Sequence, residues 1–247
     1  MLLKGKTAVV TGCNRGIGKK ILEIFSENGA TVFACVRNIN EEFKLFSEKI
    51  SKKFNNEIIP IQLDFSKDNQ IKEAANKIIF SNKKIDILIN NAGTIETAIF
   101  QMTSEKKLKE IFEINFFSQT TFTQYILKPM IKNKKGSIIY ISSSSALDGN
   151  EGRSAYSSTK SAIIAQAKVL SRELGPHNIR VNTIAPGLTN TDMMKKNHSE
   201  AIIKDVTSRI SLKRIAEPEE VANVALILSS ELASYITGQV IRVDGGM

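Results

Sequence analysis

The feature that most constrains the fold is an alternation, along the whole chain, of short β-branched runs with longer amphipathic segments. The runs that predict strands are Thr7–Thr11, Thr31–Val36, Glu57–Leu63, Asp86–Asn90, Ser137–Ser142, Arg180–Ile184 and Val240–Val243. The segments that predict helices are Ile17–Asn28, Glu41–Phe54, Lys67–Phe80, Glu105–Lys132, Ser154–Leu174 and Pro218–Ser229. Strands that alternate with helices form a parallel sheet with helices on both faces. We therefore expect an α/β fold with a doubly wound sheet, because the crossovers are right-handed.

The chain shows no internal repeat, low-complexity tract or linker, so we expect residues 1–247 to form a single domain. In a sheet of this kind, ligands bind beyond the carboxyl ends of the strands. One long stretch, Leu188–Ile215, has no clear helix or strand pattern. Because loops of this length are usually functional, we expect a substrate lid around residues 188–215.

Charge and composition exclude several classes of partner. The formal net charge is +9, but the lysines occur as scattered pairs without interleaved aromatic residues. This pattern favours a solvated surface over a nucleic-acid site. The apolar run after Met1 is too short for a signal peptide or a membrane span, so we expect a cytoplasmic protein that does not enter membranes. Two cysteines and two isolated histidines predict reduced thiols and no metal site.

A glycine cluster lies between the first strand and the first helix, in Thr11–Gly18. Gly12 would permit a tight turn, Gly16 a close backbone approach to a pyrophosphate, and Gly18 close contact between helix and strand. The first N–H groups of the helix would then face the phosphates, aided by the helix dipole. We therefore expect the loop to contact the dinucleotide through Gly12, Asn14, Arg15, Gly16, Ile17 and Gly18.

The end of the second strand indicates which dinucleotide binds. An NAD site normally has an acidic residue there for the ribose 2′-hydroxyl, but this chain has Arg37, with Arg15 in the glycine loop. Two guanidinium groups suit a 2′-phosphate, so NADP(H) is favoured over NAD(H). Asp64, after the third strand, could accept a hydrogen bond from the adenine amino group or could instead be a helix cap.

A tyrosine and a lysine four residues apart predict the chemistry. Tyr156 and Lys160 share a face of one helix. A lysine charge about 4 Å from the phenol, at an effective dielectric of about 20, is worth about 4 kcal/mol, or up to about three pKa units. We therefore expect Lys160 to lower the pKa of Tyr156, which would act as the general acid in reduction and the general base in oxidation.

Together with Thr11–Gly18 and Tyr156–Lys160, three further features resemble the short-chain dehydrogenase/reductase family. They are Asn90-Asn91-Ala92-Gly93, the serine run Ser142–Ser145, and Pro186-Gly187 after the sixth strand. The likeness extends over essentially the whole chain to the ending Ile236–Gly246. It implies a Rossmann-type sheet of about seven strands in the order 3-2-1-4-5-6-7, and commonly a homotetramer built through Glu105–Lys132 and Ser154–Leu174.

The resemblance also assigns roles to further residues. The family's catalytic serine lies thirteen residues before the tyrosine, which selects Ser143 with Ser142 as the rival. Asn115 matches the helix asparagine that holds a water in a proton relay to Lys160, although it could equally be tied to a neighbouring carbonyl. The remaining contacts to the dinucleotide implied by the likeness are Asn91, Ala92, Gly93, Tyr156, Lys160, Pro186, Gly187, Leu188, Thr189 and Thr191.

The substrate is left between alternatives. Within the family the chain looks most like the 3-oxoacyl carrier-protein reductases, but Thr94–Ile99 departs from their pattern. Glu96, Asn150, Glu151 and Arg153 would suit a sugar, a polyol or a charged substrate, or could be solvated loop residues. A catalytically silent binding or regulatory protein is a third reading, against which Asn115, Ser143, Tyr156 and Lys160 argue together.

Overall fold

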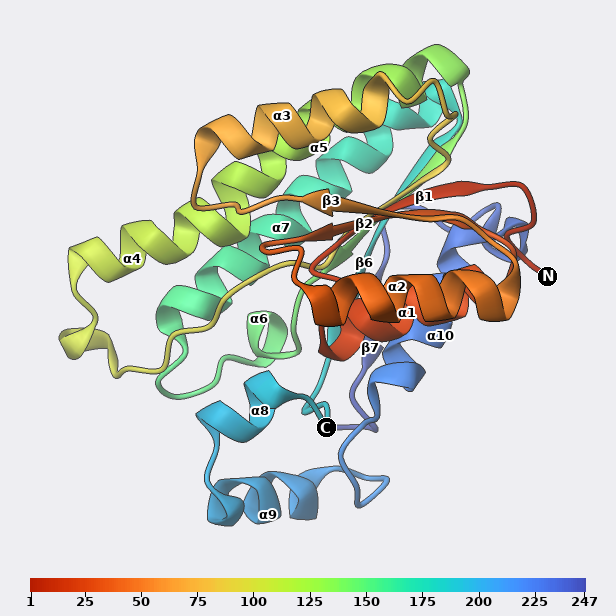
Figure 1. The fold of residues 1–247 in the computed structure, drawn as a ribbon. Coiled ribbons are helices and arrows are strands. Elements are labelled where there is room, and N and C mark those ends of the chain that lie inside the picture. The colour runs from red at the N-terminus through yellow and green to blue at the C-terminus, as the bar shows by residue number, and fades with distance from the viewer.

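A seven-stranded parallel sheet is the centre of the molecule (Figure 1). The computed structural model describes all residues, 1–247. The strands are β1 (Thr7–Thr11), β2 (Thr31–Val36), β3 (Ile58–Gln62), β4 (Ile87–Asn90), β5 (Gly136–Ile141), β6 (Ile179–Pro186) and β7 (Val240–Val243). Their order is β3-β2-β1-β4-β5-β6-β7, which confirms the predicted topology. Strand order reverses between β1 and β4, so a crevice for ligands is expected at their carboxyl ends.

Helices cover both faces of the sheet. Those of one layer are α1 (Gly16–Glu27), α2 (Glu41–Phe54) and α10 (Pro218–Ser229), and those of the other are α3 (Asp68–Ile79), α4 (Glu105–Phe112), α5 (Ser118–Asn133) and α7 (Ser154–Leu174). Short helical turns complete the chain: η1 (Phe100–Met102), α6 (Ser145–Asp148), η3 (Gly175–His177) and η4 (Glu231–Ala233). The two layers bury the central strands β1 and β4 completely, while the edge strands β3 and β7 remain partly exposed.

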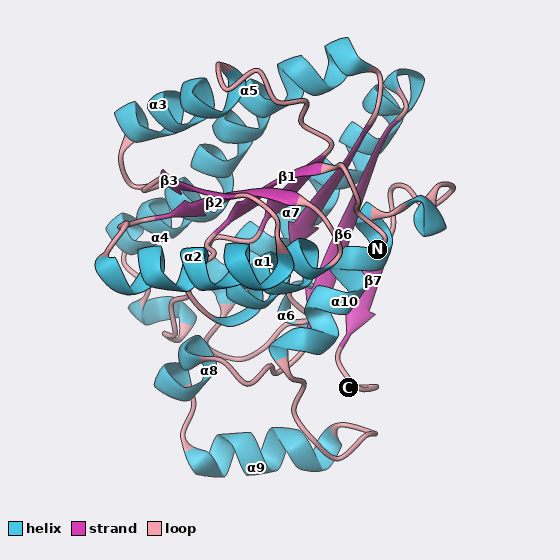
Figure 2. Cartoon of the chain, turned by 45° about the vertical axis from the view of Figure 1, so that its right-hand side comes forward, coloured by secondary structure: helices cyan, strands magenta, loops and turns pink.

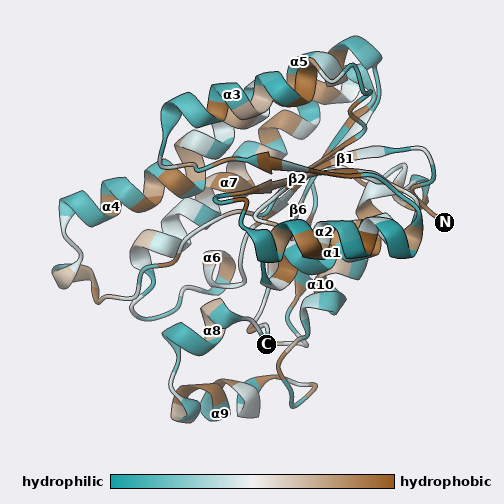
Figure 3. Ribbon diagram, in the orientation of Figure 1, coloured by the Kyte–Doolittle hydropathy of each residue, from teal (hydrophilic) through white to brown (hydrophobic).

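Alternation along the central strands explains the two layers. In β1, Ala8 and Val10 pack into the cluster that contains Phe25 of α1. Val9, between them, faces the opposite cluster, with Phe122 of α5. Successive side chains of a strand point to opposite faces, so a fully apolar strand feeds two cores at once. Figure 3 shows the strands as largely hydrophobic, while hydrophilic residues line the outward sides of the helices.

The predicted helix Glu105–Lys132 is not continuous. Between α4 and α5 the chain makes one π-helical turn, η2 (Glu113–Phe117). A π turn inserts an extra residue into the helix and is frequent at functional sites. Here it places the Asn115 side chain in the interior, with no exposed surface.

The stretch expected to be a loop contains two helices. These are α8 (Asp192–Asn197) and α9 (Glu200–Arg209), which lie beyond the end of the sheet to which β7 points (Figure 2). The two stems of this segment are joined, because the Asn190 N–H donates to the Ala216 carbonyl and the Ala216 N–H to that of Leu188. Residues 188–215 therefore form a helical segment, called the flap below, whose two ends are held together by backbone hydrogen bonds. No helix of the protein is both long enough and apolar enough to cross a bilayer.

Candidate active site

The glycine loop has the shape that the sequence predicts. Gly12 and Gly16 adopt positive φ angles of 74° and 54°, which side chains disfavour. A Cβ on Gly18 would lie 2.2 Å from the Gly12 carbonyl oxygen, so only glycine fits where α1 meets β1. Arg15 is the N-cap of α1, but its side chain makes no capping bond. The first N–H groups of this helix are thus available to an anion.

The segment after β4 packs against this loop. The Asn91 side chain donates from Nδ2 to the Thr11 carbonyl at 2.8 Å, and the Thr11 hydroxyl accepts from the Asn91 and Ala92 N–H groups at 3.0 Å each. The asparagine amide therefore acts as a brace between two strand ends. Thr11 belongs to the Thr11–Gly18 motif, but the sequence predicted no role for its hydroxyl, because that role depends on contact with the segment after β4.

Arg37 and Asp64 lie side by side at the ends of β2 and β3. Arg37 Nε is 3.9 Å from Asp64 Oδ1, and the arginine side chain is largely exposed, as is Arg15. Asp64 also accepts from the N–H and hydroxyl of Ser66. Partial burial opposes ionisation of this carboxyl, but the Ser66 bonds and the charges of Arg37 and Lys67 outweigh it and keep its pKa below the usual value. Asp64 caps a turn, and α3 begins beyond it with Lys67 as N-cap.

The two rival serines point in different directions. Ser142 is buried, and its hydroxyl donates to the Lys160 carbonyl at 2.9 Å, on the backbone of α7. The Ser143 hydroxyl lies 2.9 Å from the Ser145 hydroxyl and is near enough to the Tyr156 phenol to act against the rise of its pKa. One step along the chain reverses the side-chain direction. Geometry therefore pairs Ser143, rather than Ser142, with the tyrosine.

Lys160 and Asn115 meet next to Gly93. A Cβ on Gly93 would lie 3.2 Å from Asn115 Oδ1 and 3.4 Å from Lys160 Nζ. Lys160 is buried and donates to the Ile141 carbonyl at 2.8 Å. Both ends of the Asn115 carboxamide are occupied: it accepts from the Thr94 N–H and donates to the Thr94 carbonyl, each at 2.8 Å. Asn115 thus fixes the chain just after Asn90–Gly93, a contact that no sequence motif signals.

The pKa of Tyr156 corrects one expectation. Burial raises the pKa of the phenol, although the Ser143 side chain and the Arg153 charge act in the opposite direction. Lys160 Nζ lies 5.8 Å from the centre of the tyrosine ring. Burial also lowers the pKa of Lys160 to about 8, so its charge is partly lost near that pH. In this structure desolvation outweighs the attraction that the spacing alone suggested.

The flap starts beside the glycine loop. A Cβ on Gly16 would lie 3.1 Å from Cγ2 of Thr191, whose hydroxyl caps α8 by accepting from the Met194 N–H. Gly187 packs against Asp244, where a Cβ would come within 2.7 Å. Residues from Pro186 to Thr191 therefore run from the end of β6 to the glycine loop.

Four residues were expected either to contact the substrate or to be solvated loop residues: Glu96, Asn150, Glu151 and Arg153. Of these, Arg153 is buried. It lies at the N-cap of α7 with only 6% of its surface exposed, and Nη2 is 3.1 Å from Nε2 of His198 in the flap. Glu96 is half-buried, 3.9 Å from Lys107, while Asn150 and Glu151 are exposed.

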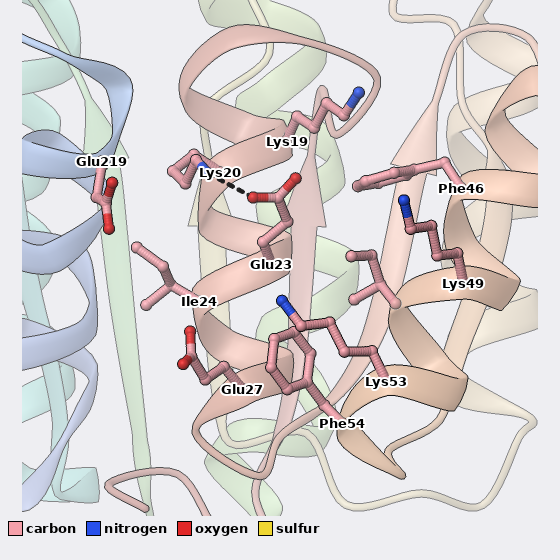
Figure 4. A pocket seen from close by; sticks show the side chains of 11 residues that line it. Lys19, Lys20, Glu23, Ile24, Glu27, Phe46, Lys49, Lys53, Phe54 and Glu219 are labelled. Atoms are coloured by element: carbon pink, nitrogen blue, oxygen red, sulfur yellow. Dashed lines mark hydrogen bonds and ion pairs between the residues drawn. The ribbon is translucent and has the colours of Figure 1, made fainter.

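A separate groove of about 430 Å³ lies between α1 and α2 (Figure 4). Its polar lining mixes both signs of charge: Lys19, Lys20, Glu23, Glu27, Lys49, Lys53 and Glu219. Lys20 is paired with Glu23. None of the predicted catalytic side chains reaches this groove, so we look for the chemistry at the strand ends.

Known proteins resemble this chain over its full length. A family model described as enoyl-(acyl carrier protein) reductase matches residues 12–247. A 3-oxoacyl-[acyl-carrier-protein] reductase of Chlamydia muridarum is 38% identical over 247 residues, covering 100% of this chain and 98% of the relative. One from Aquifex aeolicus is 40% identical over 245 residues, with 99% and 98% covered. A solved structure of a candidate NAD(P) dependent gluconate 5-dehydrogenase from Beutenbergia cavernae, with NADP bound at low occupancy, has a TM-score of 0.93 at 28% identity, covering 99% and 97%.

Proposed function

Because the chain belongs to the short-chain dehydrogenase/reductase family and is an oxidoreductase of that family, we propose that it uses NADP(H) to interconvert a ketone and a secondary alcohol. Its substrate is a 3-oxoacyl group on an acyl carrier protein. The observation that carries the proposal is the placement of Ser143 on the Tyr156 side, while Ser142 is tied to the backbone of α7, together with the buried amine of Lys160 on the same helix as the tyrosine.

The residues present fit a phosphorylated dinucleotide. The uncapped N-terminus of α1 offers backbone N–H groups to a pyrophosphate. Arg15 and Arg37 have exposed guanidinium groups that no hydrogen bond within the chain engages, so both can reach a 2′-phosphate. The resemblance to the NADP-containing structure supports the same choice. Asn14, Ile17, Asp64, Ala92 and Leu188 remain proposed contacts to the cofactor.

Bound NADPH would supply the hydride. Tyr156 would hold the proton that passes to the substrate oxygen in reduction, and would take it back in oxidation. The Ser143 hydroxyl would donate to the same oxygen and stabilise its developing negative charge. Lys160 would stabilise the phenolate, while Asn115 holds the Thr94 backbone at the wall of the site.

Relatives named for acyl-carrier substrates support the thioester proposal. A second candidate, a sugar or polyol oxidoreductase, is favoured by the likeness to the candidate gluconate dehydrogenase. A catalytically silent role is the most distant reading, because the complete set of side chains would then serve nothing.

Absorbance at 340 nm tests the proposal. We expect the protein to oxidise NADPH in the presence of an acetoacetyl thioester at an ordinary turnover of about 1 s⁻¹ or more. A panel of sugar ketones and polyols, with both cofactors, is the comparison. No turnover of the thioester together with turnover of a polyol would replace the first candidate by the second.

A further inference from the structure

Arg153 holds a charged group in the interior without an acidic partner. Only 6% of the residue's surface is exposed, and its titratable neighbours are Tyr156 and His198. Nη2 meets His198, but Nη1 is buried and has no hydrogen-bond partner. An unpaired buried cation is costly, and nearly all buried donors in proteins are satisfied. The free donor therefore calls for an acceptor that the chain itself does not provide.

Position places this donor at the reacting centre. Arg153 is the N-cap of α7 and precedes Tyr156 by three residues, in the first turn of the same helix. The charge of the arginine acts on the Tyr156 hydroxyl and favours its ionised form. The flap closes the other side, since His198 follows α8 directly. The guanidinium thus lies between the tyrosine and the flap.

The bond to His198 uses only one of the two terminal nitrogens of Arg153. His198 Nδ1 is 3.1 Å from the Met194 carbonyl, which can only accept, so Nδ1 carries the hydrogen. Nε2 is then an acceptor, and it receives the Arg153 Nη2 hydrogen. The imidazole orients the guanidinium through one nitrogen and leaves the second terminal nitrogen for another ligand.

We propose that Arg153 is a specificity-determining residue whose Nη1 binds a second oxygen of the substrate, a carbonyl or carboxylate oxygen a few bonds from the ketone that is reduced. This inference rests on the proposed function and narrows its substrate class to 3-oxo thioesters and 3-oxo acids. A positive donor prefers acceptors that carry negative or partial negative charge, and such bonds are among the stronger ones in proteins. Substrates with an isolated ketone would leave the donor unsatisfied.

A matched pair of substrates tests the inference. One is acetoacetyl-N-acetylcysteamine, and the other is the thioether ketone in which a methylene replaces its thioester carbonyl. In Arg153→Met we expect kcat/KM to fall roughly 10- to 100-fold for the thioester and less than about threefold for the thioether. Arg153→Lys, which keeps a cationic donor, should recover part of the loss. Equal losses on the two substrates would overturn the inference.

His198→Leu separates recognition from closure of the flap. This variant breaks the same bond but keeps the arginine, so its effect should be similar for both substrates. A selective loss for the thioester in His198→Leu, equal to that of Arg153→Met, would assign the discrimination to the flap and contradict our proposal.

Binding without turnover distinguishes this inference from the proposed function. In a Tyr156→Phe background, calorimetry with NADPH present measures the Kd of the acetoacetyl thioester and of acetoacetate. We expect Arg153→Met to weaken the binding of at least one of these two ligands by about tenfold or more. Whichever ligand binds more tightly to the parent shows whether Arg153 recognises a thioester or a free acid. If Arg153→Met leaves both Kd values unchanged, or if the Tyr156→Phe protein binds neither ligand, the inference is overturned. If binding depends on Arg153 but the wild type does not turn over the thioester, only the proposed reaction is overturned.

Discussion

At the scale of single residues, burial governs the ionisable groups of the site. Tyr156 and Lys160 lie on one helix, yet burial shifts both toward their neutral forms, raising the pKa of the phenol and lowering that of the amine to about 8. Arg153, whose charge favours the phenolate, comes from the same helix one turn earlier. The pKa of Tyr156 is therefore set by burial, Ser143 and Arg153 rather than by a tyrosine–lysine pair.

Lys160 should make stability depend on pH. Its folded pKa of about 8 is below the ordinary value of 10.5, so the unfolded chain binds the proton more tightly. Burial of the charged amine therefore lowers the free energy of unfolding by its full amount below pH 8, and this loss of stability diminishes as the pH rises toward 10.5. Lys160→Met removes this pH-dependent loss of stability. The free energy of unfolding of the variant minus that of the wild type should therefore decrease by about 2 kcal/mol between pH 7 and pH 9.5. Urea unfolding at both pH values measures this difference; a constant value would contradict it.

Arg15 and Arg37 should decide the choice of cofactor. Replacing both by alanine removes the donors proposed for the 2′-phosphate, which NADH lacks. We expect kcat/KM for NADPH to fall roughly 100-fold and that for NADH to change less than about threefold. The ratio of the two values, measured by initial rates, is the readout. A wild-type preference for NADH would refute the assignment before any variant is made.

At the scale of elements, close packing of α1 on β1 depends on one glycine. In Gly18→Ala the new Cβ meets the Gly12 carbonyl and Asn91 Nδ2 at 2.2 and 2.4 Å, so backbone must move. We expect a loss of stability of about 1–3 kcal/mol and weaker NADPH binding. Gly175→Ala is the matched control, because no heavy atom lies within 4 Å of its Cβ and its φ is helical. Thermal unfolding compares them; equal melting temperatures would show that the contact does not matter.

The regular elements were predictable because their patterns are long and two-sided. β1, β2, β7, α2, α7 and α10 begin and end where the sequence indicates. The π turn at Glu113–Phe117 was not, since its residues continue the helical pattern and only packing shows the extra residue. Helices α8 and α9 were missed because α9 buries no side chain, so apolar periodicity is weak. Their N-caps, Thr191 and Ser199, were the available signals.

The sequence predicted the parts of the site that belong to short local motifs. It did not predict the parts that depend on contacts between residues far apart in the chain. The glycine loop and the Tyr156–Lys160 spacing could be found from sequence. The choice between Ser142 and Ser143 needed the likeness to a family, and geometry now separates them. The burial of Arg153 depends on His198, forty-five residues away, so local sequence could not reveal it.

At the scale of the whole molecule, α4–α5 and α7 leave apolar side chains uncovered. Phe117 and Val169 expose 52% and 54% of their surface. We propose that these helices form the interfaces of a homotetramer, and sedimentation should give about four times the chain mass of 27.3 kDa. Val169→Lys should lower that mass, whereas Leu45→Lys on α2, also an exposed apolar site, should not. A monomer in the wild type would contradict the proposal.

The central claim is that Tyr156 transfers the proton beside a bound dinucleotide, and Tyr156→Phe tests it most directly. The substitution removes only the hydroxyl, so NADPH should bind with a Kd within about threefold of the wild type. Turnover of the acetoacetyl thioester, or of whichever ketone the wild type reduces, should fall about 100-fold or more, as expected for loss of a general acid. Undiminished turnover in Tyr156→Phe, with the cofactor bound, would contradict the account.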